Sequence, residues 1–482
     1  MKMVRFLIMF LIGLSALMAS AVVSLCSNLK DVNNRASYVI ITPTSYYAMA
    51  ETLAAFRHEK NGFTTMVVNV DTIFAQFGAG VSPDTALKNF IQYALNNWSD
   101  PKPQYFVLSG NTNTIPSHPE PETIPDPGFD TLLMIDQWFV EAPDSKGIQR
   151  VNACIGRLPA KDSLSLSVII GKTIEYEKDS VGAWCARSIS LSDYDYVNGN
   201  LFENDANYIE SMLGSLWRDT VSVNIRGDSP YHLDSTGFLN LWNAGAAIVT
   251  YSGHANQVVL SATGYFTTQD IDSLHNGDRL PVCLLGGCDL TYDTGPQLSI
   301  PTHLLERNGG GAVAVISSEG LMYESTTESF YSSMIRSMIQ KPDEPIGISF
   351  EKTKAGWNDW DPGIVERFTF LGDPALTVKH PAATTFVQRP SSHPESFALM
   401  QNYPNPFNPS TTIQFTVPND GRAKLKVYNS LGQAVATLFD GVATAGEYHR
   451  ATFDASRMAS GMYFSRLEFD GRMQVKKMLL LK

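Results

Sequence analysis

The sequence lacks an excess of positive charge. It has 36 Lys and Arg residues against 48 Asp and Glu residues, which gives a formal net charge of −12 and a pI near 5.2. A nucleic-acid partner is therefore excluded, because the chain has no basic field that could displace the counterions of a polyanion. The 482 residues are 44% hydrophobic and 17% charged, which indicates a globular protein of two or three domains.

Long apolar runs are missing except at the N-terminus. Residues 1–21 place two basic residues before an apolar stretch that ends in Ala-Ser-Ala, and this pattern predicts a secretory signal peptide. Cys26 suggests a lipid anchor as an alternative, but Leu25 is bulky where a lipidation site needs a small residue. The sequence predicts a mature chain with no transmembrane segment, located outside the cytoplasm.

Cysteine is scarce. The five cysteines are Cys26, Cys154, Cys185, Cys283 and Cys288. This number is too small for the disulfide scaffold of an exported protein, and an odd count leaves at least one thiol unpaired. No second Cys or His pair follows at metal-ligand spacing, which argues against a zinc site.

From residue 37 onward, short apolar runs alternate with helical stretches. The segments "SYVIITP", "TTMVVNV" and "QYFVLSGN" are typical of strands, and amphipathic stretches separate them. Strands that are apolar on both faces and are joined by helices predict an α/β fold, with a parallel sheet covered on both sides. The first subdomain spans residues 37–148. Its Pro-rich part, residues 111–148, is expected to be a long irregular surface excursion.

Residues 149–380 repeat this organisation in a second α/β subdomain. Its predicted strands are "SISLSD", "GAAIVTYSGH", "LPVCLLGGC" and "GGGAVAVISS". Each strand ends in a small or polar residue, and we expect these ends to lie along one edge of the sheet, where open α/β folds bind ligands.

The composition changes after residue 380. Residues 381–396 are rich in Pro, Ser and Thr and lack periodicity, which indicates a linker. Residues 397–482 contain short alternating strands separated by Gly, Asn and Asp turns, which predict a small β-sandwich.

Two predicted strand ends carry residues suited to catalysis. "TYSGH" ends at His254 and "LLGGC" ends at Cys288. If their strands are neighbours, the two side chains face one substrate, as a cysteine nucleophile and a histidine general acid/base require. In the alternative interpretation, Cys288 is a small core residue and His254 is merely exposed. Cys283 lies inside the apolar run and is typical of a structural thiol.

The order of five segments resembles the catalytic domain of gingipain-type cysteine peptidases, of the caspase-like clan. These segments are "IGRLPAK…KTIEYEK", "YSGHA", "LPVCLLGGC", "GGGAVAVISS" and "FLGDPAL". The resemblance implies that the chain is a cysteine endopeptidase that requires no cofactor. It implies that His254 is the catalytic histidine and Cys288 the nucleophile. It also implies that the backbone N–H groups of Ala255 and Cys288 form the oxyanion hole.

The sequence departs from the gingipain pattern at two positions near the expected site. Ala255 stands where the family usually has Gly, and its N–H can serve only if its φ angle is negative. Asn152 stands in the segment where gingipains carry a supporting carboxylate, so Asn152 is the candidate for orienting the imidazole. These departures favour a rival interpretation, an inactive gingipain-like protein that acts in binding or adhesion at the cell surface.

Three acidic residues are candidates for specificity or metal binding. Asp162 is either the base of an S1 pocket for Arg or Lys, or the N-cap of the helix that follows it. Asp193 and Asp195 lie in "SDYDYVNGN", where oxygen ligands alternate, and they are candidates for a structural Ca²⁺, an ion that gingipain-like proteins often bind. The segment has no closing Glu, which favours a solvated turn instead.

The last part of the chain resembles the sorting domain of the type IX secretion system. The resemblance rests on "NYPNPFNPSTTIQFTVP", "LKVYNSLGQAVATL" and "SGMYFSRLEFDGRMQVKKMLLLK". It implies that the type IX machinery is a partner, and that the protein is secreted or attached to the cell surface after passing through the periplasm. Its peptidase part would act on a protein or peptide substrate.

Overall fold

The computed structural model describes residues 28–121, 132–143, 149–178, 181–194, 201–227, 229, 231–291, 298–357, 366–381, 397–399, 402, 407–444 and 449–481. The predicted signal peptide 1–21, Cys26, Asp195 and nearly all of the predicted linker lie outside these residues. The chain divides into two compact units, residues 1–382 and 383–482. Within the described ranges, no helix combines the length and apolarity needed to cross a bilayer.

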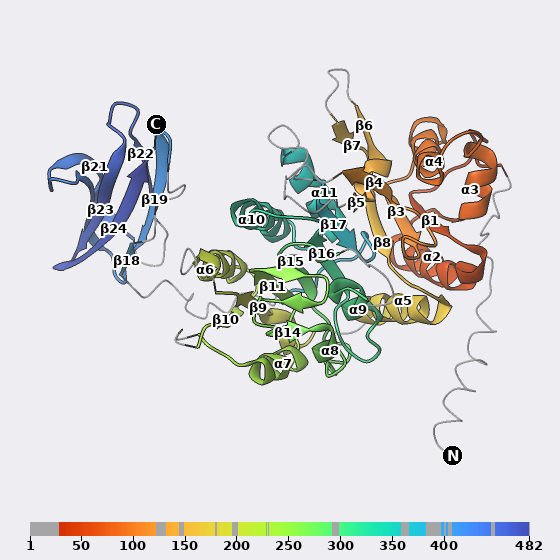
Figure 1. Cartoon of the computed structure of the whole chain (residues 1–482), viewed down its shortest axis with the longest axis horizontal. Coiled ribbons are helices and arrows are strands. Elements are labelled where there is room, and N and C mark those ends of the chain that lie inside the picture. The colour runs from red at the N-terminus through yellow and green to blue at the C-terminus, as the bar shows by residue number, and fades with distance from the viewer. Residues whose placement is uncertain are drawn as a thin grey trace, which may run out of the picture. The chain divides into compact units, whose positions relative to one another are not determined.

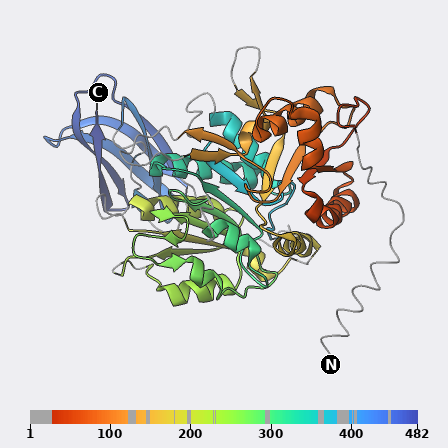
Figure 2. The same cartoon turned by 45° about the vertical axis from the view of Figure 1, so that its right-hand side comes forward.

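One ten-stranded sheet runs through the first unit, and strands from both predicted α/β subdomains belong to it (Figures 1 and 2). In spatial order its strands are β10 (Asp219–Asn224), β9 (Arg187–Ser192), β11 (Ile248–Ser252), β15 (Val282–Gly286), β16 (Ala314–Ser318), β17 (Phe368–Leu371), β8 (Cys154–Leu158), β3 (Tyr105–Ser109), β1 (Tyr38–Thr42) and β2 (Thr65–Asn69). The predicted α/β fold is confirmed.

The sheet reverses direction once, at its middle. β10, β9, β11, β15 and β16 are parallel to one another, and β17, β8, β3, β1 and β2 are parallel to one another. The antiparallel pair β16 and β17 joins the two sets. The carboxyl ends of β9, β11, β15 and β16 therefore share one edge of the sheet with the amino ends of β17 and β8. We call this the site edge.

Helices cover both faces of the sheet, which explains why most of its strands are apolar on both sides. One face packs against α2 (Tyr47–Asn61), α5 (Ser163–Lys178), α7 (Ser235–Asn243), α8 (Thr268–Ile271) and α9 (Ile300–Glu306). The other packs against α3 (Val70–Phe77), α4 (Pro83–Asn97), α6 (Leu201–Leu213), α10 (Glu324–Gln340) and α11 (Ile346–Trp357). β15 is buried along its whole length, as its apolar run predicts.

The segment predicted as an irregular excursion is more ordered than expected. It contains the hairpin strands β4 (His118–Pro121) and β5 (Leu132–Ile135), the short 3₁₀ helix η2 (Gln137–Val140), and the strand β6 (Glu141–Pro143), which pairs with β7 (Gln149–Val151) just after the segment. Phe139 and Val140 are fully buried. Their apolar side chains pack in the core that α3 and α4 cover, so part of the excursion belongs to the fold, although its prolines predicted only surface loop.

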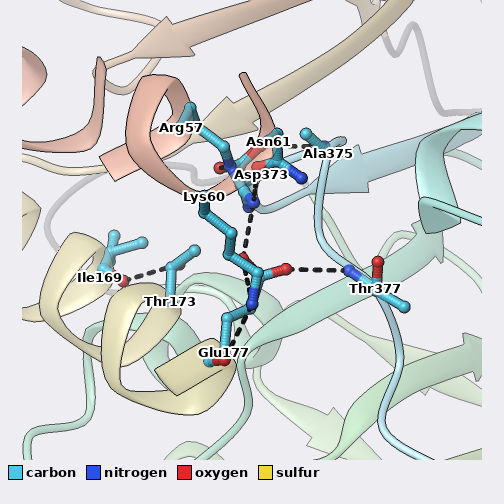
Figure 3. A network of polar contacts seen from close by, with 9 residues as sticks. All are labelled: Arg57, Lys60, Asn61, Ile169, Thr173, Glu177, Asp373, Ala375 and Thr377. Atoms are coloured by element: carbon cyan, nitrogen blue, oxygen red, sulfur yellow. Dashed lines mark hydrogen bonds and ion pairs between the residues drawn. The ribbon is translucent and has the colours of Figure 1, made fainter. Parts of the chain in front are cut away.

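A buried ionic network lies at the edge of the sheet opposite the site edge (Figure 3). The Arg57 guanidinium on α2 donates to Asp373 at 2.7 Å, just after β17, and to Glu177 at 2.6 Å on α5. Asp373 also accepts the Ala375 N–H, and Glu177 accepts the Thr377 N–H. The network thus connects elements that are about 120 and 316 residues from Arg57 in sequence.

The second unit is a β-sandwich with its own core, as predicted. One sheet contains β18 (Ala398–Leu399), β19 (Ser410–Thr416) and β22 (His449–Asp454). The other contains β21 (Ala434–Ala443), β20 (Gly421–Asn429), β23 (Gly461–Phe469) and β24 (Arg472–Leu480). Alternating residues of β20 and β23 are buried between the sheets, the period expected of strands with one solvent-exposed face.

Candidate active site

The sheet places His254 and Cys288 at neighbouring strand ends. β11 and β15 are adjacent and parallel, and Ser252 pairs with Gly286 at the end of the ladder. His254 and Cys288 each follow two residues after this last pair. Because adjacent strands lie about 4.8 Å apart, both residues emerge side by side at the site edge. The two strands are thus neighbours, which the sequence interpretation had only assumed.

The turn that carries Cys288 requires its two glycines. A Cβ on Gly286 would lie 2.4 Å from the Thr327 Cγ2, and a Cβ on Gly287 would lie 2.5 Å from the Ala255 Cβ. The chain therefore packs against the histidine loop with no room for side chains. Asp289, directly after the cysteine, has a φ of 50°, a left-handed conformation that is uncommon for residues other than glycine and clusters at functional sites.

The two neighbouring thiols differ in accessibility. Cys283 is fully buried, and its burial raises the pKa of its thiol. Cys288 is only partly buried, and its Sγ lies 3.9 Å from the Met322 carbonyl oxygen. Cys288 is therefore the thiol of this pair that solvent reaches.

A buried carboxylate, that of Asp193, fixes the backbone of His254 by a hydrogen bond. Asp193, 2% exposed, accepts the His254 N–H at 3.2 Å, the Ser261 hydroxyl at 2.8 Å and the Tyr194 N–H at 2.7 Å. The Tyr251 hydroxyl donates to the His254 carbonyl at 2.6 Å. These bonds fix the histidine backbone while the imidazole stays exposed at the edge.

Burial and the nearby Asp193 charge keep Tyr251 in its neutral form. Burial, first, and the Asp193 charge, second, hold the pKa of Tyr251 well above its usual value. The phenol therefore remains a hydrogen-bond donor to the His254 carbonyl. The imidazole of His254 also meets the Phe202 ring of α6 edge-on, with 5.2 Å between ring centroids.

Ala255 meets the condition set by the sequence for an oxyanion donor. It lies in the short strand β12 (Ala255–Asn256), and it is not among the described residues with positive φ. It faces Leu260 of β13 (Val259–Leu260), and the flanking bond runs from the Ser261 N–H to the His254 carbonyl. In such a non-hydrogen-bonded pair, the Ala255 N–H points away from β13.

Asp162 caps a helix. Its carboxylate accepts the Ser165 N–H at 2.7 Å in the first turn of α5, and this bond lowers the pKa of Asp162. The residue follows the carboxyl end of β8, which lies at the edge of the sheet opposite Cys288. The structure therefore supports the capping interpretation, and it does not bring Asp162 to the site.

Asn152 shares the site edge but not the site. It is exposed and precedes β8, three strands from β15 and four from β11. At the spacing of strands in a sheet, it is roughly 19 Å across the sheet from His254. The sheet does not bring the Asn152 side chain to the imidazole, because β15, β16 and β17 lie between their strands.

The predicted calcium ligands are not gathered into a metal site in the part of the chain that the structure describes. The Asp193 carboxylate is occupied by hydrogen bonds from the protein, and Asp195 lies outside the described residues. No group of three or more His, Cys, Asp or Glu side chains among the described residues is arranged to hold a metal ion.

Sequence reasoning missed a group of three carboxylates near the pair. Asp205 lies on α6, and Glu324 and Glu328 lie on α10, which packs against α6. Burial, and next a hydrogen bond with Glu324, raise the pKa of Asp205 to about 10. The group forms between helices more than a hundred residues apart in sequence, so no local pattern could reveal it.

Comparisons with known proteins agree with this architecture. The family model described as peptidase family C25 matches residues 31–379, and a model of the secretion system C-terminal sorting domain matches residues 401–481. No curated protein matches the sequence.

Two solved structures from Porphyromonas gingivalis proteins share the fold. The crystal structure of the Arg specific cysteine proteinase gingipain R (RgpB) has a TM-score of 0.59 at 16% identity, and the match covers 94% of this chain and 99% of that one. The complex of the RgpB pro- and mature domains has a TM-score of 0.58 at 15% identity, covering 92% and 100%. Through the match of its family model, and in keeping with the resemblance seen in the sequence, the chain belongs to peptidase family C25 and ends in a sorting domain that directs it to the cell surface or the medium.

Proposed function

We propose that the protein is an exported cysteine endopeptidase in which Cys288 is the nucleophile and His254 the general acid/base. The observation that carries this proposal is the register of β11 and β15, which sets the two residues side by side at one edge of the sheet. Family membership supports it. The exposure of His254 and the partial exposure of Cys288 leave both accessible to a peptide.

In the proposed reaction, the Cys288 thiolate attacks the scissile carbonyl carbon and forms a tetrahedral adduct. The N–H groups of Ala255 and Cys288 stabilise its oxyanion. His254 protonates the leaving amine, which departs and leaves a thioester on Cys288. Water, deprotonated by His254, then hydrolyses the thioester and regenerates the thiol. Asp193 and Tyr251 contribute by fixing the His254 backbone.

We further propose a preference for Arg or Lys before the scissile bond, with Asp205 and Glu324 as the carboxylates that receive it. The relative described as Arg specific motivates this preference. Phe202, on the same helix as Asp205, contacts His254. Glu324 follows shortly after Met322, whose carbonyl lies near the Cys288 thiol. A cationic side chain would compensate this carboxyl pair, in which burial and the neighbouring Glu324 raise the pKa of Asp205.

Peptide cleavage tests the catalytic assignment. The exported protein should hydrolyse a peptide library, and Cys288→Ala should lower kcat/KM by at least about three orders of magnitude, as loss of a nucleophile does in related chemistry. Cys283→Ala is the matched control and should retain cleavage. An inactive wild type would favour the rival interpretation, a binding protein of the same fold.

Specificity is tested separately with peptides that differ only in the residue before the cut. Asp205→Asn should reduce the preference for Arg over Leu by about 10- to 100-fold, since it removes one of the two carboxyl groups that would pair with the cation. Asp162→Asn, which affects a helix cap, should leave the preference unchanged. Equal effects of the two substitutions would contradict the assignment of Asp205.

A further inference from the structure

The turn that carries Cys288 is held by the chain that leaves β16. The Asp289 N–H donates to the Gly320 carbonyl at 2.9 Å, and the Leu290 N–H donates to the Ser318 carbonyl at 3.1 Å. The Ser318 hydroxyl donates to the Gly287 carbonyl, so it fixes the peptide plane between Gly287 and Cys288. The geometry of the nucleophile therefore depends on where residues 318–320 lie.

Glu319 lies in the middle of this exit segment and anchors it on its other side. Its Oε2 accepts the Met134 N–H of the β4–β5 hairpin at 2.6 Å, and its Oε1 accepts the Thr369 hydroxyl of β17 at 3.3 Å. Its own N–H donates to the Arg367 carbonyl. Glu319 thus joins the hairpin, β17 and the support of the Cys288 turn through one side chain that is 4% exposed.

A cavity of about 30 Å³ separates the Glu319 carboxyl from the end of the turn, and its lining includes Asp136, Arg157 and Thr291. This volume suits a single water molecule. The Thr291 hydroxyl is bonded to Ser317 at 2.6 Å, so the turn and the exit segment meet at the cavity wall as well.

The charges that face Glu319 do not favour its ionised form. Arg157 on β8 already forms an ion pair with Asp136 at 2.6 Å, and Asp136 raises the pKa of Glu319 more than Arg157 lowers it. Lys354 on α11 also faces the carboxyl, but Glu351 and Glu141 interact with Lys354 more strongly. Burial is the largest cause, and it raises the pKa of Glu319 to about 8.

We propose that Glu319, in its neutral form, is a positioning residue that holds the Cys288 turn in its working geometry, and that loss of its proton loosens the turn. Ionisation places a charge in a buried site whose neighbouring cation is already paired, so the hairpin and the exit segment must separate to admit water. The proposal rests on the proposed peptidase function for its activity readout, but its second readout, the reactivity of the thiol, needs no substrate.

The test measures alkylation of Cys288 by iodoacetamide from pH 5.5 to 9.5, using mass spectrometry of the peptide that contains it. In the wild type, the rate should show two inflections. One belongs to the thiol. The other, near pH 8, which we call the second inflection, should raise the rate at least threefold as the turn loosens. Over the same second inflection, kcat/KM for peptide cleavage should fall at least threefold. The loosened turn no longer positions the Cys288 thiol for attack, although iodoacetamide reaches the thiol more easily.

Glu319→Gln keeps the size of the side chain, can accept the Met134 N–H through its amide oxygen and donate to the Thr369 hydroxyl through its amide nitrogen, and cannot ionise. It should therefore abolish the second inflection in both profiles. Glu351→Gln is the matched control, since Glu351 is also buried with a pKa raised by burial to about 8 but lies on α11 and accepts a hydrogen bond from Gln137. It should leave both inflections in place. Loss of the inflection in Glu351→Gln, or its persistence in Glu319→Gln, would overturn the proposal.

Thr369→Val provides a second variant if Glu319→Gln does not fold. The Thr369 hydroxyl lowers the pKa of Glu319, so its removal should move the second inflection to higher pH, and an unmoved inflection would overturn the proposal. A wild type that shows the two-step alkylation profile but cleaves no peptide would refute the peptidase and leave this inference standing. If the wild type cleaves peptides and Glu319→Gln leaves the pH profile unchanged, the peptidase function is supported and the role of Glu319 is refuted.

Discussion

Buried carboxyl groups lie at opposite edges of the same sheet, and they differ in whether a cation compensates their charge. At one edge, Asp373 and Glu177 flank the Arg57 guanidinium at 2.7 and 2.6 Å, and backbone N–H groups satisfy their remaining oxygens. At the site edge, Glu319 is as well buried but faces an arginine that is already paired.

The difference separates a structural role from a responsive one. Burial alone would lower the pKa of Arg57, but Asp373 and Glu177 raise it above its usual value, so this network stays charged at any physiological pH. Burial instead raises the pKa of Glu319 to about 8, so this carboxyl group changes charge at a pH close to physiological values. The ionic network joins α2, α5 and the end of β17, whereas Glu319 adjoins the proposed chemistry.

Removal of the cation from the paired network should have the largest effect. Arg57→Ala leaves two buried carboxylates uncompensated, and such a loss costs about 3–5 kcal/mol in the free energy of unfolding. All seven Trp residues lie before residue 382, so Trp fluorescence in urea reports the first unit. Arg187→Ala, which breaks an exposed pair with Asp219, should cost less than about 1 kcal/mol. Similar costs for the two variants would contradict the structural role of the network.

The unpaired carboxyls should give the protein an unusual pH dependence. Glu319 and Glu351 have folded-state pKa values of about 8, above the unfolded value, so the folded state binds more protons between about pH 4.5 and 8. Each group therefore stabilises the fold fully below this range and loses that contribution as the pH rises through about 8.

The measurement is the difference in unfolding free energy between each Gln variant and the wild type. The wild type loses stability as the pH rises and the Gln variants do not. The unfolding free energy of Glu319→Gln or Glu351→Gln should therefore rise relative to that of the wild type by about 1 kcal/mol per pH unit between pH 5 and 8. A difference that stays constant with pH would show that the carboxyl in question is not protonated in the folded protein.

Much of the first unit follows from its sequence, for reasons that these residues make plain. Strands β11 and β15 are rich in apolar residues, and glycine stands at or directly after their ends. Their burial and the emergence of His254 and Cys288 at strand ends could therefore be predicted from local pattern. The burial of Phe139 and Val140 could not, because the surrounding prolines indicate only loop. Glu319 and Asp205 acquire their properties from hairpins and helices distant in sequence, and no spacing within their own segments reports this.

Asp193 shows the same limit in another form. Its alternation with other oxygen-bearing residues suggested a calcium ligand, but a carboxylate after a buried strand can equally bind backbone N–H groups from a neighbouring loop. Only the pairing of β9 with β11 brings the Asp193 carboxylate within hydrogen-bond distance of the His254 N–H. The departure at Asn152 likewise loses its expected role, because three strands lie between β8 and the β11 strand that carries His254.

The smallest effect concerns the helix cap. Asp162→Ala removes the acceptor for the Ser165 N–H at the start of α5, and loss of an N-cap costs about 1 kcal/mol. Thermal unfolding followed by Trp fluorescence should show this loss, with no change in the residue preferred before the cut. A change in preference without a loss of stability would show that Asp162 acts in substrate recognition and not as a helix cap.

Labelling of the native protein with a peptidyl acyloxymethyl ketone that carries Arg at its reactive end tests the central claim most directly, because the reagent reacts only with a thiol that is positioned and activated as a nucleophile. Mass spectrometry should find the peptide adduct on Cys288 and none on Cys283, and His254→Ala should suppress the adduct while iodoacetamide still reaches the thiol. If the ketone leaves Cys288 unmodified in the folded wild type, or labels it equally well without His254, the two residues do not form a catalytic pair.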